Sequence, residues 1–192
     1  MFKSILLICL FSLIGSVKEG KIRTIEKEGY TVVYDEVKRQ PVKVTYRVIC
    51  NRTLYSRKGL DFEEEAGVIT SGDEDYTNNE WDKGHMAPAA DFSCNEELLR
   101  QTFSYVNCAL QHEKLNRGVW KKLETREREL SKRYVVNIII SVHFSGSSRR
   151  LKSGAVIPDA FTKTISYGRE EERFYFRNEE PKSRNIDDYI LR

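Results

Sequence analysis

The sequence predicts an α+β domain with a mainly antiparallel β-sheet flanked by helices, and three observations support this fold class. Residues 42–48 alternate apolar and polar side chains, as a strand with one buried face does. Residues 113–133 repeat apolar side chains with a helical period, and residues 134–144 form a near-continuous apolar run. Strand-rich, helical and again strand-rich segments therefore follow one another along the chain.

The composition is that of one folded domain. A chain of 192 residues with 40% apolar residues can bury a sizeable core. Its 32 basic and 29 acidic residues are too balanced for a disordered polyelectrolyte, and 11 glycines with 4 prolines exclude a low-complexity chain. We expect residues 18–192 to form a single domain.

The amino terminus has the pattern of a secretory signal. Lys3 precedes residues 5–17, which carry no charge and are too few for a membrane-spanning helix of about 20 residues. We expect a signal peptide over residues 1–17, with cleavage somewhere in 15–20, and a secreted or periplasmic protein without stable membrane association. An uncleaved anchor is the alternative.

The first strands and the loop after them are predicted from turn signals. Residues 38–41 carry such a signal, so residues 30–34 and 42–48 should form a hairpin. Residues 59–82 hold nine acidic residues and no basic one, which predicts a long loop. We expect this loop to turn away from any site that binds a polyanion.

Two helices are expected in the middle of the chain. Residues 93–96 resemble a capping box ahead of a helix through about residue 103, and a second helix should run over about 113–133. Four apolar residues form the core stripe of the second helix: Leu115, Val119, Leu123 and Leu130. Four other residues lie together along one flank of that stripe: Asn116, Trp120, Glu124 and Glu127. Residues 134–144, 155–165 and 173–177 are the later strand candidates.

Three cysteines remain after signal removal, which allows one disulfide and one free thiol in an oxidising compartment. A bond between Cys94 and Cys108 would close a loop around the first helix and contribute about 3 kcal/mol in the loop-entropy model. The pairing among Cys50, Cys94 and Cys108 stays open. No CxxC spacing is present, which argues against a thiolate zinc site or a redox dithiol.

One histidine lies in a context that looks arranged for chemistry. His85 follows Gly84, which lets the backbone turn sharply, and precedes Pro88, which stops any helix. Such a histidine is held on a loop or at a strand end. A neutral imidazole with a pKa near 6.5 can take a proton from an attacking water molecule.

Several motifs together resemble the DNA/RNA non-specific endonuclease family with the ββα-metal, or His-Me, finger. They are Asp-Lys-Gly-His-Met-Ala-Pro at 82–88, Ser-Tyr-Val-Asn at 104–107 with Gln111, and Leu-Asn-Arg-Gly-Val-Trp at 115–120 with Leu123-Glu124. Weaker similarity extends from residues 30–47 to residues 157–163. The resemblance implies a metal-dependent endonuclease that hydrolyses phosphodiester bonds of DNA, RNA or both with little sequence preference.

The resemblance also implies a role for each matching residue. His85 corresponds to the general base, Asn116 to the Mg²⁺ ligand, and Glu124 to the carboxylate that orders the water shell of the metal. Asn107 supports the geometry of the site, and Arg57 corresponds to an arginine that stabilises the phosphate. Mg²⁺ suits this donor set because it prefers oxygen ligands and retains several waters, and Mn²⁺ is a candidate substitute.

Basic residues are candidates for contacts with the nucleic acid. Residues 114–133 hold eight basic and three acidic residues, although a solvated face with ion pairs is equally common. Lys83 stands where the family usually has arginine, and it loses the planar fork of that side chain. The substrate-binding candidates are Lys83, Lys121, Lys122 and Arg126. The chain ends close to where family members continue, so it is either a trimmed domain or a fragment.

Two other functions remain as alternatives. One is an exported nucleic-acid-binding protein of the same fold with impaired catalysis, suggested by Lys83 in place of arginine and by the short carboxyl terminus. The other is a zinc hydrolase using His85, His112 and His143, although the HExxH spacing is missing. The oligomeric state is open, with a homodimer among the alternatives.

Overall fold

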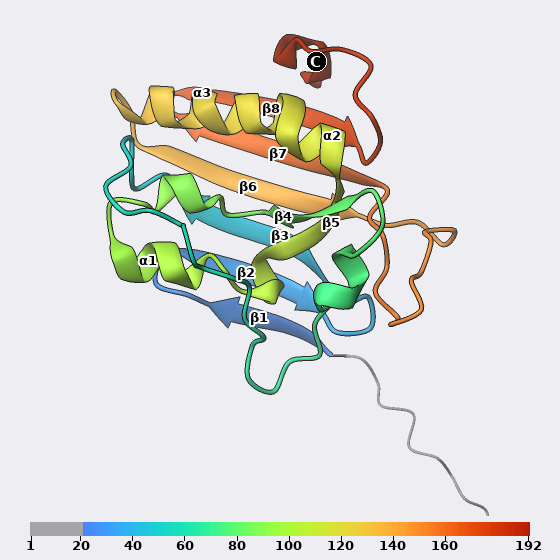
Figure 1. Ribbon diagram of the computed structural model, residues 1–192. Coiled ribbons are helices and arrows are strands. Elements are labelled where there is room, and N and C mark those ends of the chain that lie inside the picture. The colour runs from blue at the N-terminus through green and yellow to red at the C-terminus, as the bar shows by residue number, and fades with distance from the viewer. Residues whose placement is uncertain (1–20) are drawn as a thin grey trace, which may run out of the picture.

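A computed structural model describes residues 21–192, whose main sheet has six antiparallel strands. Figure 1 shows this sheet with helices packed in front of it. The strand order is β1-β2-β3-β6-β7-β8, which confirms the predicted fold class. The bounds are β1 Ile22–Glu26, β2 Tyr30–Asp35, β3 Gln40–Arg47, β6 Val136–His143, β7 Ala160–Tyr167 and β8 Glu170–Arg177. The predicted signal peptide and its cleavage site lie outside the described residues. Among residues 21–192, no helix is long and apolar enough to span a bilayer.

The predicted hairpin is present as β2 and β3. The turn between them passes through Arg39 at a φ of 52°, just after the acidic end of β2. Strand β1 pairs with the outer edge of β2 and was not predicted. Its alternation of exposed and half-buried residues gives a weak signal, because an edge strand covers little of the core.

The segment that carries the candidate site lies between two strands that are neighbours in the sheet. After β3 the chain leaves the sheet and returns only at β6, which pairs with β3. The intervening residues form β4 (Trp81–His85), α1 (Glu96–Gln101), β5 (Cys108–His112) and the long helical stretch, and Figure 1 shows them on one face of the sheet. Strands β4 and β5 pair with each other as a separate two-stranded sheet.

The second predicted helix is confirmed, with a kink. It comprises α2 (Glu113–Leu115), a π-helical turn η4 (Asn116–Trp120) and α3 (Lys121–Ser131). The kink lies at Gly118, whose φ and ψ of −100° and −114° are not helical. Leu115, Val119 and Leu123 are buried as predicted, and Leu130 packs against the same core. The flank beside this stripe is also partly in the core, because Trp120 and Glu127 are fully buried.

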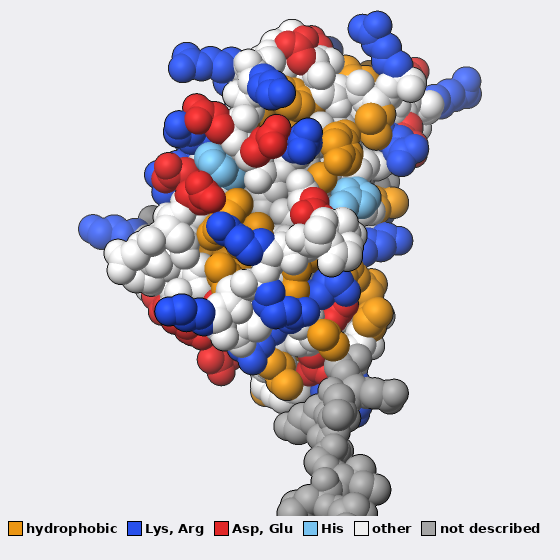
Figure 2. Space-filling view, turned by 90° about the vertical axis from the view of Figure 1, so that its right-hand side faces the viewer, with side chains coloured by type: hydrophobic (Ala, Val, Ile, Leu, Met, Phe, Trp, Pro, Cys, Tyr) orange, Lys and Arg blue, Asp and Glu red, His pale blue; other side chains and the backbone are white. Residues whose placement is uncertain are grey.

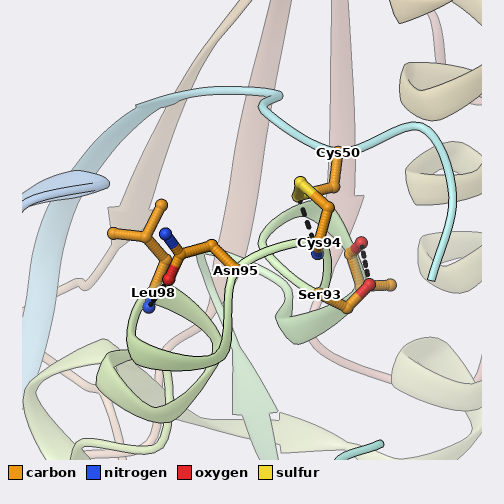
Figure 3. The surroundings of a disulfide bond; sticks show 6 residues. Cys50, Ser93, Cys94, Asn95 and Leu98 are labelled. Atoms are coloured by element: carbon orange, nitrogen blue, oxygen red, sulfur yellow. Dashed lines mark hydrogen bonds between the residues drawn. A yellow bond between two sulfur atoms is a disulfide. The ribbon is translucent and has the colours of Figure 1, made fainter. Parts of the chain in front are cut away.

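Helix α1 begins later than the predicted capping box. The cap is Asn95, whose side-chain oxygen accepts a hydrogen bond from the backbone N–H of Leu98 at 3.1 Å (Figure 3). The Ser93 hydroxyl instead donates to the carbonyl of Ala90 at 3.0 Å. Asparagine and serine are both good caps, and here the chain path before the helix selects Asn95.

The disulfide joins Cys50 to Cys94, so the suggested bond between Cys94 and Cys108 is wrong (Figure 3). Backbone N–H groups of Ile49 and Cys50 both donate to the carbonyl of Asp91, which places the segment after β3 beside the segment before α1. Cys108 is buried as a free thiol at the start of β5. A bond that closes a loop of this length contributes about 2–4 kcal/mol.

The later strands bury one face of the sheet. In β6, Val136, Ile138, Ile140 and Val142 are buried, whereas Ile139 on the opposite face is 39% exposed. The near-continuous apolar run is therefore an alternating strand with additional apolar residues on its open face. The strand candidate at 155–165 begins only at residue 160, and the candidate at 173–177 extends back to residue 170.

Candidate active site

Six of the predicted site residues line one open pocket of about 790 Å³, which we call the central pocket, and four of them are the candidates for catalysis and metal binding. Arg57 comes from the loop after β3, His85 from the end of β4, Asn116 from η4 and Glu124 from α3. These residues are up to 67 positions apart in the sequence, from 57 to 124. The crossover between β3 and β6 is what brings their segments together.

His85 packs against two aromatic rings that also contact each other. The ring centroids of Phe62 and Phe103 lie 4.7 Å and 4.8 Å from that of the imidazole. Its Nε2 is buried without a hydrogen-bond partner among the described residues. Burial first, and then the charge of Arg57, lower the pKa of His85 to about 3. The ring is therefore neutral near pH 7, the form that can accept a proton.

This lowered pKa predicts how His85 affects stability. Between pH 6.5 and about 3 the unfolded chain binds a proton that the folded chain does not, so the contribution is complete above pH 6.5 and is lost as the pH falls. Urea unfolding of wild type and His85→Gln at pH 7 and 4.5 measures it. We expect the free energy of unfolding of wild type, relative to that of the variant, to be lower at pH 4.5 than at pH 7. A difference that does not change with pH would contradict the lowered pKa of His85.

The backbone around His85 is fixed by its neighbours in β5. A Cβ on Gly84 would lie 2.6 Å from the Gln111 side chain, so only glycine fits at this position of β4. Asn107 is fully buried, and its carboxamide accepts from the N–H of Ala87 at 2.8 Å and donates to the carbonyl of Ala87 at 2.9 Å. Asn107 thus holds the chain just after the histidine, without lining the central pocket.

The carboxamide of Asn116 is oriented by an acidic residue of β4. Its Nδ2 donates to Oδ2 of Asp82 at 2.9 Å, and Asp82 in turn accepts two hydrogen bonds from Arg117, at 2.8 Å and 2.5 Å. Because the nitrogen is engaged, the oxygen of Asn116 is the atom left for a cation. Asp82 is a positioning residue that the sequence motif contained and that had no assigned role.

Glu124 lies deeper in the central pocket than an ordinary surface carboxylate. Burial raises its pKa to about 7, although the positive charge of Lys163 acts in the opposite direction. A nearby cation would favour the ionised form. Near neutral pH this carboxyl group can therefore either accept a hydrogen bond from water or hold a proton.

Arg128 also lines the central pocket, although the sequence indicated it only as one of the eight basic residues in 114–133. It lies one helical turn beyond Glu124, and its Nη1 donates to the buried carboxylate of Asp91 at 2.7 Å. Burial, followed by the charge of Glu127, raises the pKa of Asp91 well above its usual range. The helical spacing of Glu124 and Arg128 was a signal that could have identified both as pocket residues.

The acidic loop approaches the site, which corrects the expectation that it turns away. Lys83 forms ion pairs with Asp61 at 3.2 Å and with Asp73, and its Nζ lies 5.4 Å from the ring centroids of both Phe62 and Tyr105. The two carboxylates raise the pKa of Lys83 above its usual range. Lys83 lines the central pocket with its charge already balanced by this loop.

The other substrate-binding candidates lie in different places. Lys121 is exposed and lines the central pocket. Lys122 faces a neighbouring pocket, and its Nζ donates to the carbonyl of Arg184 at 2.8 Å. Arg126 lies outside both pockets and forms an ion pair with Glu172 at 2.5 Å. Of these candidates, only Lys121 is both in the central pocket and without a carboxylate partner among residues 21–192.

The three histidines do not form a metal cluster. Nδ1 of His112 accepts from the N–H of Lys114 at 3.2 Å, and Nε2 of His143 lies 2.7 Å from the hydroxyl of Thr162 in the sheet. Within residues 21–192, no group of three or more His, Cys, Asp or Glu side chains could hold a metal ion. The geometry thus fails to support the zinc-hydrolase alternative.

One known family matches nearly the whole chain. The profile of the family described as DNA/RNA non-specific endonuclease matches residues 13–189. The chain belongs to this family. Members are typically metal-dependent, and Asn116 supplies an oriented oxygen donor at the position expected from the motif.

Individual relatives of this endonuclease-family chain are longer. Nuclease EXOG, mitochondrial, from Danio rerio is 33% identical over 111 residues, which are 55% of this chain and 32% of the relative. Endonuclease G, mitochondrial, from Homo sapiens is 29% identical over 120 residues, or 60% of this chain and 40% of the relative. The chain thus spans about a third of the length of the curated relatives it matches.

A solved structure supports the fold. The crystal structure of an EndoG/EndoGI complex superposes with a TM-score of 0.78 at 20% identity, covering 90% of this chain and 81% of that chain. This chain therefore shares the fold of that structure.

Proposed function

We propose that this chain is a metal-dependent nuclease that hydrolyses phosphodiester bonds of DNA, RNA or both with little sequence preference. The observation that carries the proposal is the central pocket, where a neutral imidazole, an oriented carboxamide and a carboxylate from separate segments face one space. Family membership supports the same reaction class. Contacts to phosphate and metal rather than to base edges carry little sequence information.

In the proposed mechanism His85 is the general base. The imidazole takes a proton from the attacking water, and its burial against the rings of Phe62 and Phe103 keeps it neutral before substrate binds. The negative charge of a bound phosphodiester raises the pKa of the ring, because an adjacent anion favours the imidazolium. Proton acceptance is thus coupled to the presence of substrate.

The remaining pocket residues stabilise charge. The oxygen of Asn116 fits a Mg²⁺ ion with a mostly aqueous shell, which when bound supplies charge stabilisation for the phosphoryl oxygens and the leaving alkoxide. With the metal bound, Glu124 would hold a water molecule of that shell, and Arg57, which is exposed and has no carboxylate partner among residues 21–192, would contact the phosphate.

We also propose that the protein is exported. The apolar residues 5–17 have the pattern of a signal peptide, and the Cys50–Cys94 disulfide is of a kind that persists in oxidising compartments. Recovery of the chain, cleaved within residues 15–20, from the medium or periplasm tests this proposal. Recovery of the full-length chain from a reducing compartment would contradict it.

The metal requirement tests the proposed activity. We expect plasmid DNA or RNA to be degraded in Mg²⁺, to remain intact in EDTA, and to be degraded again when excess Mg²⁺ is added. Equal degradation in EDTA would overturn the metal-dependent mechanism. DNA that is retarded in a gel but uncut in Mg²⁺ would favour the binding protein with impaired catalysis, an alternative suggested by the balanced charge of Lys83.

A further inference from the structure

A second pocket adjoins the central one and contains none of the proposed catalytic residues. This flanking pocket has a volume of about 500 Å³ and lies between residues 113–122 and the segment 180–184. Arg117 lines both pockets. Lys121 and Lys122 are consecutive on α3 and line one pocket each, because neighbouring helical residues point about 100° apart. A linear ligand in the central pocket can therefore continue into the flanking one.

The charge of the flanking pocket is decided by which cations are paired. Figure 2 views the molecule from the side at which α2 lies in Figure 1, and basic and acidic side chains are interspersed there. Lys114 pairs with Glu180 at 2.6 Å, and Arg117 pairs with Glu113 at 3.2 Å. These pairs leave little charge for a ligand.

Two cations of the flanking pocket have no carboxylate partner in the part of the chain that the structure describes. They are Lys122, whose Nζ donates to a backbone carbonyl, and Arg184, which supplies that carbonyl. Both side chains are exposed and line the pocket. Gly118, Val119 and Pro181 also line the pocket and give it apolar surface. The pocket thus combines free positive charge with a surface for an apolar group.

A nucleic acid strand has the matching chemistry and length. Asn116 and Lys122 are only six residues apart and Arg117 lines both pockets, so a strand of a few nucleotides is long enough to reach from the central pocket into the flanking one. Phosphates can contact Lys122 and Arg184 while a sugar or base packs on the apolar surface. We propose that the flanking pocket is a subsite for the strand that continues beyond the scissile phosphate, and this inference rests on the proposed nuclease function.

The test compares a long and a short substrate. We expect Arg184→Ala and the double variant Lys122→Glu/Arg184→Glu to raise KM for a 20-nucleotide DNA strand by about tenfold, since a hydrogen bond to a charged group contributes on the order of 1.4 kcal/mol or more. Hydrolysis of a small nitrophenyl phosphodiester, which reaches only the central pocket, should stay unchanged. Arg184→Ala keeps the backbone carbonyl that Lys122 binds, so it tests the side chain alone.

The matched control is Lys43→Glu, an exposed charge on strand β3 outside both pockets. Equal KM values for the pocket variants and this control would overturn the subsite, as would an equal loss on the small diester. Strand affinity is also measured by fluorescence anisotropy in EDTA. There the slope of log K against log salt should fall by about 0.7 for each phosphate that the variant no longer neutralises. If wild type cleaves neither substrate, the nuclease proposal fails, while the anisotropy result still decides the subsite.

Discussion

We expect His85→Ala to lower kcat/KM for phosphodiester hydrolysis by about 10²–10⁴-fold, the usual contribution of general-base catalysis. The imidazole lines the central pocket and is neutral near pH 7, so it is in the form that can accept the proton. Steady-state kinetics in Mg²⁺ on a defined oligonucleotide measure the effect. Residual activity within about threefold of wild type would show that another group is the base.

Two controls separate catalysis from folding in this experiment. His85→Asn fills part of the space beside Phe62 and Phe103, and it should be as inactive as the alanine variant while retaining more stability. His143→Ala removes an exposed histidine on β6 that contacts Thr162 and lies outside the central pocket. This variant should keep its activity, and thermal unfolding checks that all three proteins fold.

Lys163→Met should be the most destabilising of the substitutions considered, by about 3–5 kcal/mol. The Lys163 side chain is fully buried, and its Nζ lies 2.8 Å from Oε1 of Glu127, which is also fully buried. The Tyr46 hydroxyl donates to the other oxygen of that carboxylate at 2.7 Å. Removing the ammonium leaves a buried charge with one neutral donor. The midpoint and slope of urea unfolding give the loss.

The design includes a rescue and a matched control. The double variant Lys163→Met/Glu127→Gln should regain part of the stability, because an uncharged amide is easier to bury than an unpaired carboxylate. Arg126→Met breaks the more exposed pair with Glu172 and should cost only about 0–1 kcal/mol. A loss for Lys163→Met no larger than that of Arg126→Met would mean that the buried pair adds no stability.

Catalysis should respond to Lys163 as well, although this residue does not line the central pocket. The charge of Lys163 lowers the pKa of Glu124, which burial has raised to about 7. The stabilising network in the core and the carboxylate of the site are therefore coupled through α3. For substitutions of Lys163 or Glu127, both the free energy of unfolding and the nuclease activity should therefore be measured.

Side-chain patterns predicted the fold and much of the site because they report local geometry. The period-two alternation at 42–48 fixed a strand face, and the stripe of Leu115, Val119 and Leu123 fixed the inner face of a helix. The same spacing predicted a flank that carries Asn116 and Glu124, and both residues line the central pocket. His85 was predicted to lie on a loop or at a strand end, and it is the last residue of β4.

Pairings between distant residues could not be predicted in this way. Local sequence gave no reason to prefer Cys50 over Cys108 as the partner of Cys94, and the close approach of residues 49–50 to residue 91 decided it. The acidic loop likewise contributes Asp61 and Asp73 to Lys83, which only the folded path of residues 59–82 brings about.

By itself, the amino-acid sequence determined the α+β class, the position of the long helix and the family to which the chain belongs, because these depend on periodicity and on motifs within short segments. The tertiary structure alone decided which cations are free, which carboxylates are buried and that the ring of His85 is neutral. Charge pairing and desolvation depend on neighbours from distant segments, and those neighbours are set only when the crossover between β3 and β6 packs on the sheet.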